Sequence, residues 1–84
     1  MNLSIQNFCK TFRSRTLNKT LREFEIEHGI NIKTLSAFEN GRSNNINHLS
    51  IYLKACENDT QVNIFMKGLN IALLDNANLK YEVE

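Results

Sequence analysis

The residue types with the clearest potential chemistry fall between positions 32 and 40, where a cation, a hydroxyl and apolar side chains recur at helical spacing. On a helical wheel Leu35 and Phe38 face one way, with Thr34 beside them. The opposite face is continuous and uncrowded. It consists of Ile32, Lys33, Ser36, Ala37 and Asn40.

A face of this kind suits the major groove of double-stranded DNA. Lys33 can donate to the O6 and N7 atoms of guanine, and Ser36 can hydrogen-bond with either base edge. Ile32 and Ala37 can contact the methyl group of thymine. These four side chains are the predicted base readers, although the same composition by itself also suits an ordinary solvated helix face.

Polar side chains around this stretch can reach phosphate oxygens. Several lie in or next to the loop 41–45, directly before the free N–H groups that begin the following helix. Contacts of this kind position a protein on DNA without reading its sequence. The predicted contacts to the DNA backbone are Arg22, Asn31, Asn40, Arg42 and Ser43.

Two short helices joined by a tight turn must position these side chains. Thr20 and Glu23 form a capping-box pattern, in which each side chain satisfies a backbone N–H group of the other residue. Gly29 suits the left-handed conformation that ends a helix, and Asn31 suits the N-cap of the next one. The second helix is predicted to end at Gly41.

The order of these signals resembles the Cro and phage-repressor (Xre-type) family. Its pattern has a small capping residue, a glycine nine positions later, a hydrophobic residue, a second cap and a terminal Glu-Asn-Gly. This chain matches it at Thr20, Gly29, Ile30, Asn31, Glu39, Asn40 and Gly41. The resemblance extends more weakly over 5–56. It implies a compact five-helix, lambda-repressor-like DNA-binding domain with a helix-turn-helix at about 20–41.

Further expectations depend on that resemblance. The family's glutamate implies that Glu39 pairs with Arg13 or Arg15 across the contact between the first and third helices. Leu21 stands where the family often has a glutamine that braces the DNA backbone, and leucine cannot do so. Glu25 stands where alanine is usual, which predicts either a wider helix pairing or a side chain bent outward into solvent.

Length and composition favour one all-α domain over 1–84, with a core of about 4–57. The chain has 84 residues, 42% of them hydrophobic, with no proline and three glycines, which argues against a sandwich or barrel. A first helix is predicted from Ser4 to about Ser14. Its buried stripe is predicted to be Ile5, Phe8, Cys9 and Phe12.

A fourth helix is predicted to follow a cap at Asn44 or Asn45 and to close the core. Ile51 and Ala55 are placed on its far side. Tyr52 either completes the core or turns its hydroxyl to solvent. The predicted core face is Ile46, Leu49, Leu53 and Cys56.

The last helix, from about 60 to 75, is predicted to begin at a second capping pattern, Asn58 with Gln61, and has two apolar faces. The face predicted to pack on the domain is Val62, Phe65, Met66, Leu69, Ala72 and Leu73. The second strip is Ile64, Gly68 and Ile71.

That second strip predicts a homodimer, because an isologous contact uses the same patch on both subunits. Leu79, Tyr81 and Val83 alternate with polar residues in the tail 76–84, which is expected to add contact. Two alternatives remain open from the sequence. The tail can fold back over its own strip in a monomer, or it can be a frayed terminus.

The charge distribution is uneven, although the formal net charge is only +1. The first twenty residues contain four basic residues and no acid, the second helix is acidic, and Lys33 and Arg42 restore positive charge. Each of these charged stretches, taken alone, can also be explained as the solvated face of an amphipathic helix. The basic groups at both ends of the motif also lie where a duplex backbone would pass.

Catalytic and metal-binding functions are not indicated. No nucleophile has a neighbouring general base, no glycine-rich phosphate loop occurs, and the two cysteines and two histidines lack ligand spacing. We therefore expect a non-enzyme without cofactor or metal. Cys9 and Cys56 are expected to be buried thiols in a reducing cytoplasm, with a disulfide as the alternative. No signal peptide or membrane span is indicated, so we expect no membrane association.

The resemblance implies a transcriptional regulator, most simply a repressor of phage, mobile-element or bacterial origin. It would bind an operator in double-stranded DNA sequence-specifically, as a dimer, and act by occupancy in the cytoplasm at the nucleoid. The competing hypothesis is a protein-interaction module, antitoxin-like or antirepressor-like, that keeps the helix-turn-helix core but binds a protein partner. The low net charge, the acidic second helix and Leu21 favour this alternative.

Overall fold

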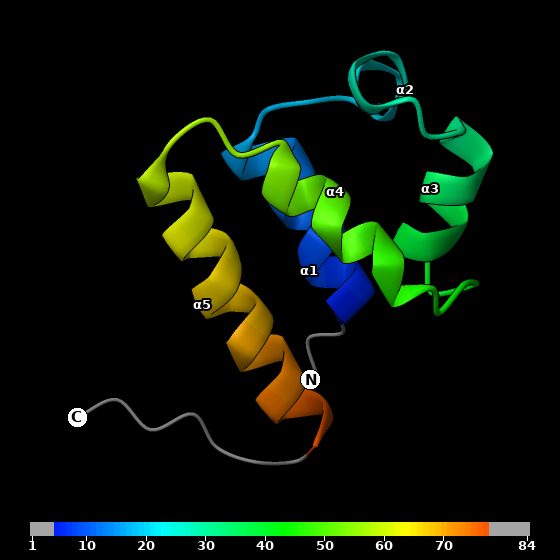
Figure 1. The fold of residues 1–84 in the computed structure, drawn as a ribbon. Coiled ribbons are helices and arrows are strands. Elements are labelled where there is room, and N and C mark those ends of the chain that lie inside the picture. Colours follow the sequence, from blue (N-terminus) through cyan, green and yellow to red (C-terminus); the bar gives the residue numbers. More distant parts are fainter. Residues whose placement is uncertain (1–4, 78–84) are drawn as a thin grey trace.

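The computed structural model describes residues 5–77, which form a compact all-α globule of five helices. No strand occurs within 5–77, in agreement with the all-α prediction. In the view of Figure 1, α1 and α4 lie between α5 on one side and α3 on the other. The helices are α1 (Ile5–Thr11), α2 (Leu21–His28), α3 (Ile32–Glu39), α4 (Leu49–Lys54) and α5 (Asp59–Asn76). A π-helical turn, η1 (Phe12–Thr16), continues α1, and a 3-10 turn, η2 (Ile46–His48), precedes α4.

The π-helical turn is a departure from the regular helix predicted up to Ser14. It brings two consecutive side chains, Phe12 and Arg13, into the interior. Asn18 ends this unit in a left-handed conformation (φ 54°), which asparagine tolerates better than most residues. The N–H of Lys19 then donates to the carbonyl of Arg13 at 3.0 Å and holds the chain as it turns toward α2.

The core is a cluster of aromatic rings that joins all five helices. Tyr52 of α4 stacks on Phe65 of α5, with ring centroids 6.2 Å apart, and lies 5.5 Å from the ring of Phe24 in α2. α1 packs against both α3 and α5. The buried members of the cluster are Cys9, Phe12, Leu17, Phe24, Leu35, Phe38, Tyr52 and Phe65.

α4 turns a different face to the core than the sequence pattern predicted. Tyr52 is fully buried, and Ile51 and Ala55 pack on the core rather than on the far side. Ile46 and Leu53, both predicted to be core residues, are 68% and 39% exposed. The 3-10 turn is a cause of this shift, because it advances three residues per turn and moves Ile46 out of phase with the α-helix that follows.

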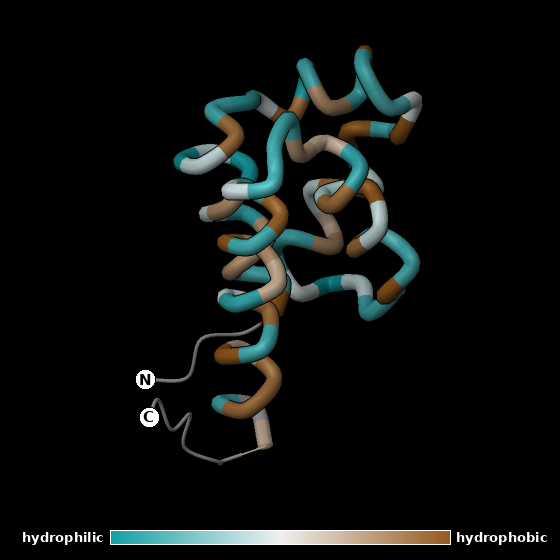
Figure 2. Tube along the Cα trace, turned by 60° about the vertical axis from the view of Figure 1, so that its left-hand side comes forward, coloured by the Kyte–Doolittle hydropathy of each residue, from teal (hydrophilic) through white to brown (hydrophobic). Residues whose placement is uncertain are grey.

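α5 begins one residue before its predicted start. The side chain of Asn58 accepts from the N–H of Gln61 at 2.9 Å, as the capping pattern predicted. The side chain of Gln61, however, accepts from the N–H of Glu57 at 2.7 Å and not from that of Asn58. The last turns of α5 are rich in apolar residues and extend beyond the other helices (Figure 2).

Some predictions concern residues beyond the described range. The cap expected at Ser4 and the tail contacts expected at Leu79, Tyr81 and Val83 lie outside residues 5–77. Within 5–77, no helix is long and apolar enough to cross a membrane.

Candidate nucleic-acid interface

The α2–turn–α3 unit, residues 20–41, is held by its own caps. The hydroxyl of Thr20 accepts from the N–H of Glu23 at 3.1 Å, and the carboxylate of Glu23 accepts from the N–H of Thr20 at 2.9 Å. This is the predicted capping box. The hydrogen bonds from Thr20 lower the pKa of the Glu23 carboxyl. Gly29 ends α2 with φ 68°, the left-handed conformation that its lack of a Cβ permits.

Two side chains cap the start of α3. Asn31 accepts through Oδ1 from the N–H groups of Lys33 and Thr34, at 2.8 and 3.4 Å. The carboxylate of Glu25 accepts from the N–H of Ile32 at 3.0 Å. Of the two alternatives for Glu25, the side chain bent outward into solvent is therefore wrong, because the free N–H at the N-terminus of α3 is a better partner for its carboxylate.

α3 turns its predicted core residues inward. Leu35 and Phe38 are fully buried, whereas Thr34, expected beside them, is exposed. Of the predicted base readers, Lys33 is exposed and the other three are half-buried. All four line one shallow hollow of about 570 Å³ on the surface, together with Leu21 and Arg42. The six lining residues are Leu21, Ile32, Lys33, Ser36, Ala37 and Arg42.

The hollow has an apolar wall and a basic rim. Leu21, at the start of α2, packs partly against the core and supplies the wall opposite α3. Leu21 was not among the predicted site residues. The sequence pattern of α3 alone contains no signal for it, because the contribution of Leu21 depends on how α2 lies across α3.

Ser36 and Asn40 are coupled along α3. The side-chain amide of Asn40 donates to the hydroxyl oxygen of Ser36 at 3.2 Å. Because this hydrogen bond uses the oxygen of Ser36 as an acceptor, the hydroxyl proton is still available to donate. A predicted base reader and a predicted backbone contact are therefore oriented by each other.

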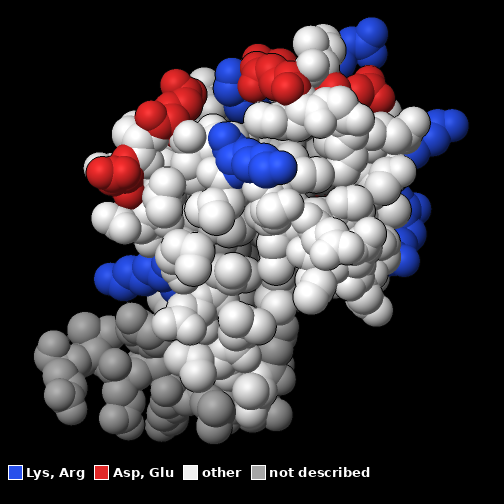
Figure 3. Space-filling model, in the orientation of Figure 1, with Lys and Arg blue, Asp and Glu red and all other residues white. Residues whose placement is uncertain are grey.

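The other predicted backbone contacts lie around the same unit. Arg22 and Arg42 are exposed, and Asn31 is exposed although its Oδ1 is committed to the cap. Ser43 is half-buried, and its hydroxyl oxygen accepts from the N–H of Asn45 at 3.4 Å. Figure 3 shows a row of Lys and Arg side chains along the edge of the molecule on which Figure 1 places α3.

A buried ion pair fixes α3 against α1 and its π-helical turn. Arg13 donates from Nε and Nη2 to the two carboxylate oxygens of Glu39, at 2.8 and 2.9 Å, and from Nη1 to the carbonyl of Lys19 at 2.7 Å. Of the two arginines expected opposite Glu39, Arg13 is the partner, and Arg15 is exposed.

Tyr52 joins this pair. Its hydroxyl donates to Glu39 at 2.7 Å, so the tyrosine both fills the core and satisfies the carboxylate. Burial, followed by the negative charge of Glu39, raises the pKa of Tyr52. The same two causes raise the pKa of Cys9 to about 12.

The surface of α5 differs from the prediction. Gly68 faces α1, where a Cβ in its place would collide with the ring of Phe8. It therefore does not separate Ile64 and Ile71 on an outward strip, although these two side chains are 44% and 36% exposed. Gly68 is therefore not part of the outward strip that was predicted to form the dimer contact.

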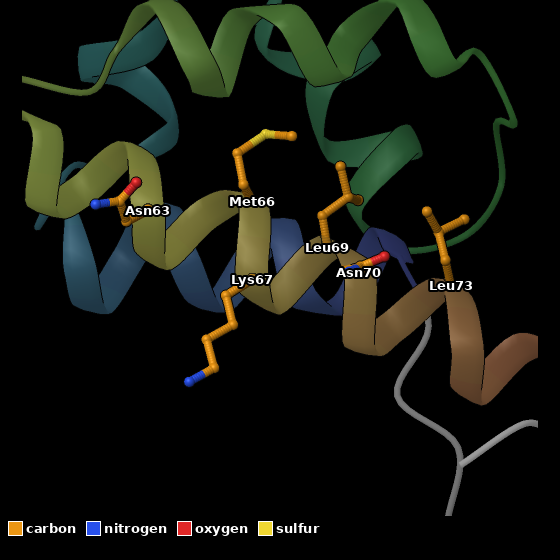
Figure 4. Close-up of a pocket in the computed structure, with 6 residues that line it drawn as sticks. All are labelled: Asn63, Met66, Lys67, Leu69, Asn70 and Leu73. Atoms are coloured by element: carbon orange, nitrogen blue, oxygen red, sulfur yellow. The ribbon is translucent and has the colours of Figure 1, made fainter. Parts of the chain in front are cut away.

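A second apolar region lies on another face of α5. Met66 and Leu73, both expected in the core, are 51% and 49% exposed. With Leu69 they point toward the same side of α5, that of α4, and line a groove of about 600 Å³ (Figure 4). The groove is flanked by Asn63, Lys67 and Asn70.

Both cysteines are free thiols, Cys9 buried and Cys56 half-buried. The thiol of Cys56 donates to the carbonyl of Tyr52 at 3.4 Å. Within residues 5–77, no three His, Cys, Asp or Glu side chains gather in a way that could hold a metal ion.

Comparisons of the chain with protein-family models, with curated proteins and with solved structures find no match. A functional interpretation therefore depends on the site itself and on the residue pattern of 20–41.

Proposed function

We propose that this protein is a sequence-specific double-stranded DNA-binding transcriptional regulator, a repressor of the phage-repressor type that acts by occupying its operator. It is not an enzyme and uses no cofactor. The observation that carries the proposal is the hollow on α3, where the four predicted base readers share one surface with Arg42 and with no acidic lining residue.

The local geometry supports α3 as the helix that enters the major groove. Its N-terminus is fixed by Asn31 and Glu25, and its C-terminal end is anchored through Glu39. A reading helix needs this rigidity, because base-edge hydrogen bonds lose strength steeply with small errors in position. Lys33 and Ser36 supply the donors, and Arg42 supplies charge for the phosphates.

Recognition of a two-fold operator requires two copies at a fixed spacing. We infer a homodimer through α5, and favour the groove of Met66, Leu69 and Leu73 as the contact. With Gly68 turned inward, the Ile64 and Ile71 strip is reduced to two side chains. The groove brings three apolar side chains together, and Asn63 and Asn70, which also line it, can hydrogen-bond across a two-fold axis.

A protein-interaction module is the second candidate. The observation that favours it is Ile26, which is 74% exposed on the outer face of the acidic helix α2. A large apolar side chain with this exposure suits a protein partner better than a polyanion.

DNA binding as a function of salt tests the proposal. Purified protein is titrated against random-sequence duplex and against the DNA that flanks its own gene, at several salt concentrations. We expect affinity to fall steeply as salt rises, because phosphate contacts release counterions. If no duplex is bound at low salt, the protein is not a DNA-binding regulator and the interaction module is the better description.

A further inference from the structure

The hollow on α3 combines two features on one small surface. Its wall is apolar, formed by Leu21, Ile32 and Ala37, and its rim carries the cations Lys33 and Arg42. An apolar wall accepts a group without hydrogen-bonding capacity, while the rim attracts a polyanion. A ligand that fits both must therefore present an apolar group on an anionic framework.

We propose that this hollow receives the 5-methyl group of a thymine, and that Leu21 is a specificity-determining residue for it. The inference rests on the proposed DNA-binding function and names the base that the site selects. In the major groove, the 5-methyl group of thymine is the apolar feature that distinguishes thymine from cytosine.

The placement of Ile32 and Leu21 supports a wall built by the fold rather than an accidental exposure of apolar side chains. Ile32 is held at the first turn of α3, because its N–H donates to Glu25. Leu21 is held from the other side, because it packs against the core and directly follows Thr20, the N-cap residue of α2. Two separately anchored residues can enclose a methyl group, which a single exposed side chain cannot do.

The lining polar groups set the register of the base. The hydroxyl of Ser36, which already accepts from Asn40, has its proton available for an acceptor such as thymine O4. Lys33 and Arg42 are then placed toward a neighbouring guanine and the phosphates. The hollow therefore selects thymine by a methyl contact and a hydrogen bond, and the cations add affinity that does not depend on this base.

The experiment replaces individual thymines by uracil, which removes only the methyl group. An operator is first selected from a random-sequence library with the full chain, and each thymine on both strands is then replaced in turn. Burial of one methyl group predicts a loss of roughly fourfold in affinity at the recognised position. Replacement there by 5-bromouracil, whose halogen has about the size of a methyl group, should restore the affinity.

Two variants connect the effect to the hollow. Leu21→Ala and Ile32→Ala should each bring the ratio of thymine to uracil affinities toward one. Ile26→Ala, an apolar truncation on α2 that does not line the hollow, should leave the ratio unchanged. Because the readout is a ratio on one protein, a uniform loss of stability does not imitate it.

The outcomes separate this inference from the proposed function. If the protein binds no duplex at low salt, the DNA-binding function itself fails. If it selects an operator but no uracil replacement changes the affinity, or if 5-bromouracil does not restore it, the hollow does not recognise a methyl group. A ratio that stays the same in Leu21→Ala would overturn the role of Leu21, whatever the result for Ile32→Ala.

Discussion

The guanidinium of Arg13 and the carboxylate of Glu39 meet in a bidentate ion pair that is almost fully buried, with a third partner in the hydroxyl of Tyr52. This contact joins the π-helical turn after α1 to the end of α3 and to α4. The orientation of α3 therefore depends on charges in the interior as well as on apolar packing.

Truncation of one partner should be costly. Glu39→Ala leaves Tyr52 and the Nε and Nη2 donors of Arg13 without their acceptor. Breaking a buried pair typically costs about 3–5 kcal/mol of the free energy of unfolding. Urea denaturation measures the change. The matched control is Glu27→Ala, which removes the partner of Lys19 from a more exposed pair with an N–O distance of 3.0 Å. We expect a much smaller loss for the control, and equal losses would contradict a structural role for the buried pair.

The stability of the protein should fall at alkaline pH. Burial and the charge of Glu39 raise the pKa of Cys9 from 9.0 to about 12, so the folded state keeps a proton that the unfolded state releases. The stabilising contribution is fully present below pH 9.0 and is lost as the pH rises toward about 12. The free energy of unfolding is measured from roughly pH 8 to 11, a range that covers the ordinary thiol pKa and the values above it. We expect this free energy to fall less steeply with pH for Cys9→Ala than for the unmodified protein. A slope identical to that of the unmodified protein would show that Cys9 does not contribute.

Gly68→Ala distinguishes an inward from an outward glycine. In an exposed helix this change stabilises by about 1 kcal/mol, because alanine is the better helix former. Here the new Cβ would collide with the ring of Phe8, so we expect a net destabilisation of roughly 1–3 kcal/mol from overpacking. Thermal unfolding of Gly68→Ala, alone and with Phe8→Leu, checks the sign. If Gly68→Ala alone is more stable than the unmodified protein, Gly68 lies on the outer surface and does not face α1.

Base readout and backbone contact should separate by mutation. Lys33→Ala and Ser36→Ala are expected to weaken binding to the selected operator more than to random DNA, because base-edge contacts carry sequence information. Arg42→Ala should weaken both alike and reduce the salt slope by about one. Lys54→Ala, an exposed cation at the end of α4 that lines neither the hollow on α3 nor the α5 groove, is the control and should affect neither. Equal losses on both DNAs for Lys33→Ala and Ser36→Ala would mean that α3 does not read bases.

Two double variants locate the dimer contact. Met66→Asp with Leu73→Asp places charge in the α5 groove and should produce monomers, because paired like charges would be desolvated at the interface. Ile64→Asp with Ile71→Asp is the matched control on another face of the same helix and should remain dimeric. Sedimentation equilibrium measures both, with circular dichroism as a check of folding. A monomeric unmodified protein, or the reverse result, would refute the groove as the interface.

The sequence by itself determined the local features of this protein. The capping box at Thr20, the left-handed Gly29 and the cap at Asn31 all follow from interactions within a few residues. The shared face of Leu35 and Phe38 follows from their helical spacing. Such signals are legible because a cap or a helical stripe depends on chemistry that recurs at fixed spacing.

The tertiary structure decided the features that depend on neighbours distant in sequence. Glu25 turns to the N-terminus of α3 because α2 brings it there, and Gly68 turns inward because α1 presents Phe8. Leu21 lines the hollow on α3 because α2 lies across α3. Helical periodicity gives the spacing of apolar faces but not which face meets a partner, because that choice depends on how whole helices pack.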